Sequence, residues 1–95
     1  MATVLIKHTV EDYETWKAYY DDHASTREEF GERGYRLYHV ADDPNEIVIL
    51  FEWDSPENAQ EFLETSDLPE VMESAGVMGE PEVYHLDEIE TKTPE

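Results

Sequence analysis

The sequence predicts a ferredoxin-like α+β fold, in which four antiparallel strands form one sheet and two helical segments cover one of its faces. Two observations lead to this fold class. Four short stretches are rich in β-branched and aromatic residues, and two longer stretches repeat apolar residues at helical spacing. In chain order these stretches give β-α-β-β-α-β, with short loops between them.

The first strand is expected over Thr3–Thr9, with Val4, Ile6 and His8 on one face and Leu5 and Lys7 on the other. Thr9 is the expected N-cap of a helix that runs to about Phe30, and Gly31 and Gly34 let the chain leave it. The inward stripe of this helix follows the 3.6-residue period and consists of Tyr13, Trp16, Tyr20, Ala24 and Arg27.

The next two strands are expected to form a hairpin. Residues Tyr35–Val40 make one strand, the cluster Asp42–Asn45 is a turn, and Glu46–Trp53 makes the other strand. Ser55 then caps a second helical segment that has Pro56 at its first position. Its inward residues are Ala59, Phe62 and Leu63.

A short helix and a last strand complete the pattern. Asp67 restarts the helix, with Glu70 at capping-box spacing. The inward stripe of this piece is Leu68, Val71, Met72 and Ala75. The fourth strand is expected over Glu82–Asp87. One domain therefore spans residues 1–88, and residues 89–95 form a polar tail.

The charge balance is strongly acidic, since 25 Asp and Glu residues against 6 Lys and Arg give a formal net charge of −19. Such a surface repels nucleic acid and anionic membranes, so neither is an expected partner. The sequence has no cysteine, its first residues show no charged region followed by a long apolar run, and no apolar run has membrane-spanning length. We expect a soluble, cytoplasmic protein adapted to high salt, where the self-repulsion is screened.

The stretch Glu46–Trp53 carries five consecutive apolar residues, from Ile47 to Phe51. A strand with one wet face would alternate apolar and polar residues, so this strand is expected to be buried on both faces. The helices of one small chain cover a single face of its sheet. We therefore expect a second copy of the chain to cover the other face, as a homodimer.

Three segments resemble the antibiotic-biosynthesis-monooxygenase-like group of dimeric α+β barrels: Ile47–Trp53, the helix start Ser55-Pro56, and Thr65-Ser66-Asp67-Leu68. The resemblance implies that two sheets pair face to face, with a pocket between each sheet and its helices. Members include cofactor-independent monooxygenases of phenols and quinols, haem-degrading enzymes and muconolactone-type isomerases. The haem-degrading members carry a tryptophan where Trp53 stands, but also an iron-binding histidine on the short helix, which has none here.

Arg27 and His23 are polar residues on an otherwise apolar helix face. A guanidinium stays charged in a protein, so an inward Arg27 requires an anion or carbonyl groups. That anion is either a ligand enolate or carboxylate, or a structural carboxylate such as Glu52. His23, one turn earlier, is either a general base or a surface histidine among acidic neighbours.

His8 shares a strand face with apolar residues, so it is expected to point inward, either as a base for a phenolic proton or as a hydrogen-bonded core histidine. His39 and His85 lie on other strands, and their facing is left open. No close ligand spacing supports a metal site. Five apolar or aromatic residues either line a pocket for a flat aromatic ligand or belong to the ordinary core. They are Trp16, Tyr20, Phe51, Trp53 and Met72.

Helix geometry separates the candidates, because Arg27 lies roughly 22 Å along the helix from the end near His8. The pocket is therefore expected either at His8 or, preferably, around His23 and Arg27. The resulting hypothesis is a monooxygenase-like enzyme that uses no cofactor or metal: His23 or His8 removes a proton and Arg27 holds the anion. The alternative is a dimeric domain that binds a small ligand or only assembles, without catalysis.

Overall fold

The computed structural model describes residues 2–64 and 68–94 and confirms the ferredoxin-like α+β fold. Each predicted helical segment is divided into two helices, so the order is β-α-α-β-β-α-α-β. The elements are β1 (Ala2–Val10), α1 (Tyr13–Asp22), α2 (Ala24–Phe30), β2 (Glu32–Val40), β3 (Asp43–Trp53), α3 (Pro56–Leu63), α4 (Leu68–Ser74) and β4 (Val77–Leu86).

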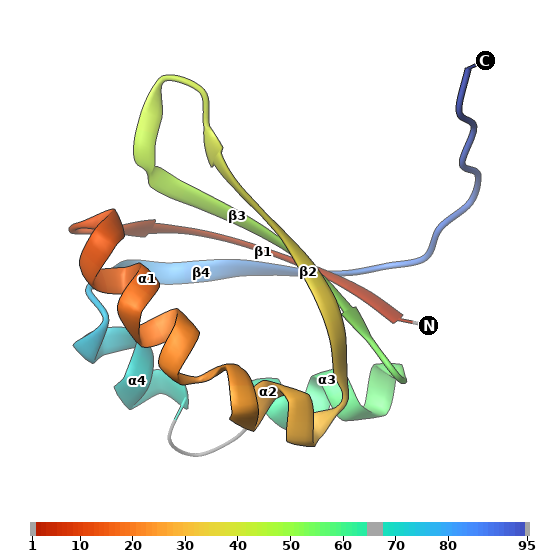
Figure 1. Ribbon diagram of the computed structural model, residues 1–95, viewed down its shortest axis with the longest axis horizontal. Coiled ribbons are helices and arrows are strands. Elements are labelled where there is room, and N and C mark those ends of the chain that lie inside the picture. The colour runs from red at the N-terminus through yellow and green to blue at the C-terminus, as the bar shows by residue number, and fades with distance from the viewer. Residues whose placement is uncertain (1, 65–67, 95) are drawn as a thin grey trace.

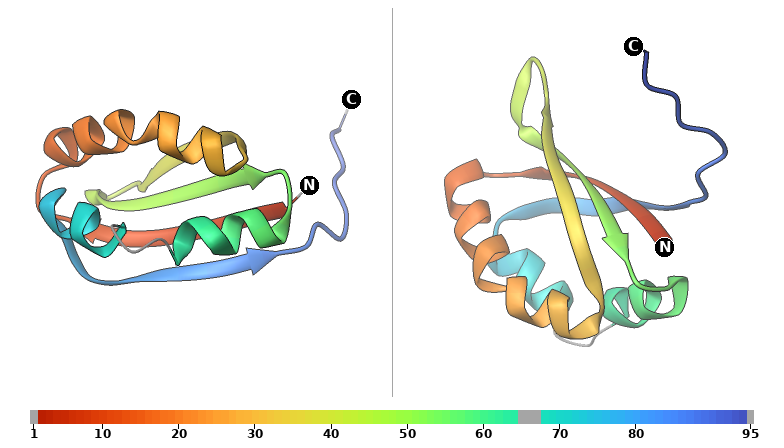
Figure 2. Two further views of the ribbon diagram at one scale, coloured as in Figure 1. Left: turned by 90° about the horizontal axis from the view of Figure 1, so that it is seen from below. Right: turned by 45° about the vertical axis from the view of Figure 1, so that its right-hand side comes forward.

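The four strands form one antiparallel sheet in the order β2-β3-β1-β4. All four described helices lie on the same side of it, as Figure 1 and the two further views in Figure 2 show. The central pair is in register through Leu5 and Leu50. Residues 87–94 continue beyond β4 without helix or strand. No helix in the described ranges is long and apolar enough to cross a bilayer.

The core lies between the central strands and the helices. Alternate residues of β1 and β3 are buried on this side, and they are Val4, Ile6, His8, Val10, Ile47, Ile49, Phe51 and Trp53. On the opposite side of β3, Val48 and Leu50 are only half-buried. Within one chain the apolar run of β3 is thus covered on one face, and the other face of the sheet has no covering element in the described residues.

The first helix does not begin at Thr9. Its N-cap is Asp12, whose carboxylate accepts a hydrogen bond from the Thr15 backbone N–H at 3.0 Å. Thr9 is still paired within the sheet, and its hydroxyl donates to Glu46 at 2.9 Å. The predicted cap was wrong because strand pairing extends to Val10 and leaves Asp12 as the next side chain able to cap.

The predicted continuous helix to Phe30 is interrupted at His23. This residue has φ −88° and ψ 1°, away from the helical ψ of about −42°. The break follows Asp21 and Asp22, two residues of low helix propensity at an end where the helix dipole disfavours negative charge. Gly31 ends α2 with φ 117°, which confirms the predicted exit, whereas Gly34 lies inside β2.

Three strands begin earlier in the chain than predicted. β2 begins at Glu32 rather than Tyr35, and the hairpin turn lies at Ala41 and Asp42, so that β3 begins at Asp43. β4 begins at Val77, because a register shift between Lys7 and Thr9 of β1 lets this edge strand pass Gly79 and Pro81.

The start of α3 is as predicted, since the Asn58 backbone N–H donates to Ser55 Oγ at 3.1 Å and Pro56 occupies the first turn. Ala59 and Phe62 are buried and Leu63 is half-buried. Thr65, Ser66 and the predicted capping residue Asp67 lie outside the described residues. In and after α4, Leu68 and Ala75 are buried, and Val71 and Met72 are half-buried.

Candidate functional site

A cavity of about 60 Å³ lies between the helices and the covered face of the sheet. It brings together most of the predicted site residues, namely His8, Trp16, Tyr20, His23, Arg27, Phe51 and Met72. It therefore extends to both of the ends that sequence spacing separated. Trp53 does not line it, because its ring packs against Phe62 and Phe51 at centroid distances of 5.2 and 5.9 Å.

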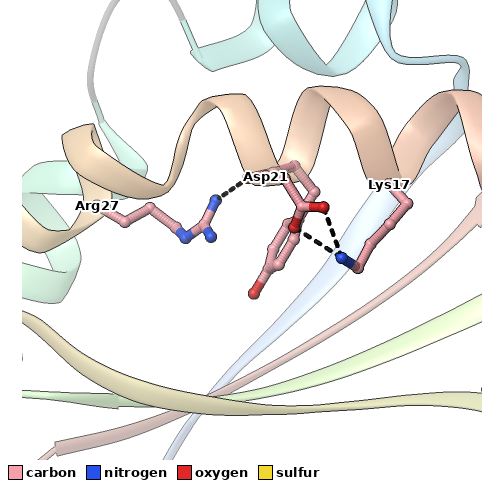
Figure 3. A network of polar contacts seen from close by, with 4 residues as sticks. Lys17, Asp21 and Arg27 are labelled. Atoms are coloured by element: carbon pink, nitrogen blue, oxygen red, sulfur yellow. Dashed lines mark hydrogen bonds and ion pairs between the residues drawn. The ribbon is translucent and has the colours of Figure 1, made fainter.

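Arg27 is the one buried cation in the described residues, with 2% of its surface exposed. Its side chain extends from α2 toward α1, as Figure 3 shows. The figure also draws the ion pair of Lys17 and Asp21 on α1, at 2.7 Å. Arg27 Nε donates to Glu32 Oε1 at 2.8 Å, and Nη1 donates to the Tyr20 carbonyl oxygen at 2.7 Å. The third nitrogen, Nη2, is buried without a hydrogen-bond partner among the described residues.

The carboxylate that pairs with Arg27 is Glu32, not Glu52. Both side chains of the pair are almost fully buried, at 3% and 6% exposed. Burial raises the pKa of the Glu32 carboxyl, and its hydrogen bond and attraction to Arg27 partly oppose that shift. Glu52 lies on the opposite side of β3 and accepts a hydrogen bond from the Thr3 hydroxyl.

Sequence reasoning missed Glu32 because the predicted strand began three residues too late. In the observed strand Glu32 is in register with Trp53, and Trp53 faces the helices. Strict alternation back from Tyr35 would still place Glu32 on the opposite face, and the register shift between Glu32 and Gly34 turns its side chain toward the helices. No residue pattern in the predicted strand indicated that shift.

Tyr20 forms one wall of the cavity and packs between Trp16 and Arg27 of the predicted inward stripe. Its ring stacks on Trp16 at 4.9 Å, and the guanidinium carbon of Arg27 lies 3.8 Å from its centroid. The Tyr20 hydroxyl is buried and has no hydrogen-bond partner among the described residues. Burial raises the pKa of this phenol and Arg27 lowers it in part, so the hydroxyl remains a proton donor.

His8 points inward, as predicted, with 5% of its surface exposed. Its ring meets Trp16 edge-on at 5.4 Å, and neither ring nitrogen has a partner among the described residues. It is thus not the hydrogen-bonded core histidine of the alternative. Burial lowers the pKa of His8 to about 4, and the nearby Glu46 carboxylate opposes this shift.

The other histidines differ in position. His23 is half-buried at the junction of α1 and α2, lines the cavity, and lies 5.7 Å from the Phe62 ring. His39 and His85 are exposed, and His39 Nδ1 contacts the Val40 carbonyl oxygen at 2.9 Å. Within residues 2–64 and 68–94, no cluster of three His, Asp or Glu side chains is placed to bind a metal ion.

The cavity is smaller than an aromatic ring requires, since benzene occupies an engineered cavity of about 150 Å³. Its walls are mostly apolar, and four of its residues are only partly covered: Tyr19 is 41% exposed, and His23, Val71 and Met72 are half-buried. A ring therefore enters only if side chains between α1 and α4 move. Without such movement the cavity has room only for a small group, and the stacked rings of Trp16 and Tyr20 lie between the His8 ring and the Arg27 guanidinium.

Comparison with solved structures identifies this architecture. An antibiotic biosynthesis monooxygenase superposes with a TM-score of 0.71 at 18% identity, over 95% of this chain and 100% of that one. SnoaB from Streptomyces nogalater, described as a cofactor-independent oxygenase, gives 0.72 at 15% identity, over 99% of this chain and 97% of that one. The chain has the antibiotic biosynthesis monooxygenase fold.

Rv0793 from Mycobacterium tuberculosis has a similar fold, with a TM-score of 0.67 at 16% identity over 98% of this chain and 100% of that one. No protein-family model and no curated protein matches the sequence. The monooxygenase fold agrees with the resemblance drawn from the third strand and the Ser55-Pro56 helix start. Helix α4 of this fold carries no histidine here, so it offers no imidazole to a haem iron.

Proposed function

We propose that the protein is a cofactor-independent monooxygenase of a small phenol or quinol, which binds in the cavity between the helices and the sheet. The observation that carries the proposal is that His8 and Arg27, an uncharged imidazole and a guanidinium, line one cavity whose other walls are mostly aromatic and aliphatic. The shared fold with a protein described as a cofactor-independent oxygenase supports it.

The base in this reaction removes the phenolic proton. At neutral pH His8 is unprotonated, because its pKa is about 4, and its nitrogen lone pair is free. An unpaired imidazole can accept a hydrogen bond from a phenol. Because a base with this pKa is weak, removal of the proton also depends on stabilisation of the phenolate by Arg27. His23, nearer the partly open side of the cavity, is the second candidate for this role.

Arg27 would hold the phenolate that results, and the aromatic walls would exclude water. The ring then supplies electrons to molecular oxygen directly: a ring carbon forms a bond to oxygen, and the hydroperoxide loses water to give a carbonyl. With hydroquinone as substrate, one hydroquinone and one molecule of oxygen give one hydroxybenzoquinone and one water. One oxygen atom enters the ring and the other leaves as water, so the substrate itself is the only reductant.

The homodimer is part of the proposal, because one sheet face is uncovered in a single chain. This face presents Leu5 and Leu50 half-buried, and Tyr38, Tyr84 and Leu86 between 39% and 51% exposed. The same face also carries the charged residues Lys7, Arg36, Glu52 and Glu82. A mixture of apolar and charged side chains is typical of an interface with an apolar centre and a polar rim. Two copies that meet through it would bury the second side of β3 and close a barrel.

A second candidate function is ligand binding without catalysis, and the Arg27–Glu32 ion pair favours it. A cation already paired with a buried carboxylate has less need of a ligand anion. The small size of the cavity points in the same direction. In this case the domain would bind a small molecule, or only assemble, and no phenol would be turned over.

Oxygen uptake with hydroquinone and methyl-substituted hydroquinones separates the two functions. We expect uptake above the spontaneous rate, and a loss of about tenfold or more in Arg27→Met and in either His8→Ala or His23→Ala. His39→Ala, at an exposed histidine outside the cavity, is the matched control and should retain the wild-type rate. Absence of uptake with the whole series, or full rates in both histidine variants and in Arg27→Met, would contradict the enzymatic proposal.

A further inference from the structure

The buried polar atoms without a partner in the described residues all belong to side chains that line the cavity. They are both ring nitrogens of His8, the hydroxyl of Tyr20 and Nη2 of Arg27. These three residues are between 2% and 7% exposed. Because buried polar groups are nearly always hydrogen-bonded, such a concentration in one cavity points to a bound group that completes them.

The guanidinium of Arg27 is fixed on three sides. Glu32 accepts from Nε at 2.8 Å, the Tyr20 carbonyl accepts from Nη1 at 2.7 Å, and the Tyr20 ring covers one face at 3.8 Å. A carboxylate that only neutralised the charge would reach lower energy as a bidentate partner of two nitrogens. Here Glu32 contacts Nε, and Nη2 remains unused.

From this geometry we propose that Glu32 is a positioning residue: it holds Arg27 so that Nη2, together with the Tyr20 hydroxyl, donates to one anionic oxygen of a ring ligand. The ligand class rests on the proposed function, that is, on a phenolate. The site itself rests on two buried donors that line the same cavity, with the guanidinium stacked on the ring that carries the second donor.

Positioning and simple charge balance predict opposite effects when Glu32 is changed. If Glu32 only cancels the charge of Arg27, its removal leaves a free cation and strengthens anion binding. If Glu32 holds the guanidinium in place, its removal lets the planar fork rotate, and anion binding weakens although a negative charge has been lost. An amide at the same position can still accept from Nε, so Glu32→Gln should preserve the position.

The test uses 4-nitrophenol, whose phenolate absorbs visible light, with the full-length protein in molar KCl. We expect 4-nitrophenol bound to the wild type to be ionised to a larger fraction than free 4-nitrophenol, at a pH just below the pKa of the free probe. Affinity for the phenolate should fall about tenfold in Glu32→Ala and be lost in Arg27→Met, but change less than about threefold in Glu32→Gln. Tyr20→Phe should weaken binding and reduce the increase in ionisation.

Arg33 provides a matched control, because it also pairs with a carboxylate, Asp54 at 3.1 Å, but at the surface, with side chains 60% and 44% exposed. Arg33→Gln should leave probe binding unchanged. Thermal melting checks the fold of each variant, and Tyr20→Phe tests the two-donor site independently if Glu32→Ala does not fold.

Tighter or unchanged binding in folded Glu32→Ala, no effect of Tyr20→Phe, or no probe binding to the wild type would overturn the inference. The readout does not require turnover. Phenolate binding with the expected variant pattern but no oxygen uptake would refute the monooxygenase proposal and leave the oxyanion site in place. Oxygen uptake without this variant pattern would refute the oxyanion site and leave the monooxygenase proposal in place.

Discussion

Arg27 and Glu32 form an ion pair at 2.8 Å in which both side chains are almost completely removed from solvent. Such a pair gains little over apolar side chains of the same size, but the loss of one partner leaves a buried charge. We expect Arg27→Met to lower the free energy of unfolding by about 3 kcal/mol or more. The double variant Arg27→Met/Glu32→Leu should recover most of that loss. Urea denaturation in molar KCl measures the free energy of unfolding of each variant. If the loss in the double variant equalled the sum of the losses in Arg27→Met and Glu32→Leu, the two side chains would not be coupled and this explanation would be contradicted.

The pH dependence of stability should contain a contribution from His8. Its pKa is lowered from 6.5 to about 4 in the folded chain, so folding requires the neutral form. The stabilisation is complete above pH 6.5 and is lost as the pH falls through about 4. With 1.36 kcal/mol for each pH unit, the loss should approach roughly 3 kcal/mol.

This contribution must be separated from those of the carboxylates. The raised pKa of Glu32 acts in the opposite direction, since its contribution is present at low pH and is lost as the pH rises through the folded value. The informative quantity is therefore the difference in free energy of unfolding between the wild type and His8→Phe, measured from pH 7.5 to 4. Between pH 7.5 and 4 this difference in free energy should change by roughly 3 kcal/mol. The His39→Phe variant, changed at an exposed position, should follow the wild type over the same range. Parallel curves for the wild type and His8→Phe would exclude the titration.

Much of the fold follows from local patterns. The apolar run Ile47–Phe51 between turn residues indicates a central strand, and the Ser55-Pro56 pair defines the start of α3 because it supplies both a cap and a fixed φ. Element ends were less predictable. The end of β1 depends on pairing with strands far along the chain, and that pairing, rather than the capping preference of Thr9, decides where α1 begins.

Most residues that the sequence suggested for a site line the cavity, but their contacts could not be predicted. A polar residue on an apolar stripe marked Arg27, and strand alternation marked His8. The partner of Arg27 depended on whether β2 begins before or after Gly34, a choice that residue propensities do not make. The separation expected from helix length still holds, since Trp16 and Tyr20 lie between His8 and Arg27 although all four residues line the same cavity.

The uncovered sheet face should be a dimer interface. Leu50 lies on the central strand of that face and pairs with Leu5. A buried carboxylate at this position would face the same residue of a second copy or its close neighbours, so Leu50→Glu should produce monomers. Sedimentation at micromolar concentration in molar KCl measures the mass. Ser25→Glu, which adds the same charge at an exposed position of α2, is the control and should remain dimeric. A monomeric wild type would remove the barrel from the proposal.

Salt should stabilise the folded chain strongly, because 25 acidic residues outnumber 6 basic ones. The screening length decreases from about 30 Å at 0.01 M to about 3 Å at 1 M salt, so repulsion between carboxylates on the surface falls steeply over this range. We expect the melting temperature to rise by more than about 10 °C between 0.01 and 1 M KCl, with most of the rise below 0.5 M, where screening changes fastest. Replacing several exposed glutamates on the outer helix surfaces, such as Glu14, Glu57 and Glu70, by glutamine should reduce this rise. The same number of aspartate-to-glutamate exchanges keeps the charge and should leave the rise unchanged. A melting temperature independent of KCl would show that the negative charge does not limit stability, and the high-salt adaptation would then have no support.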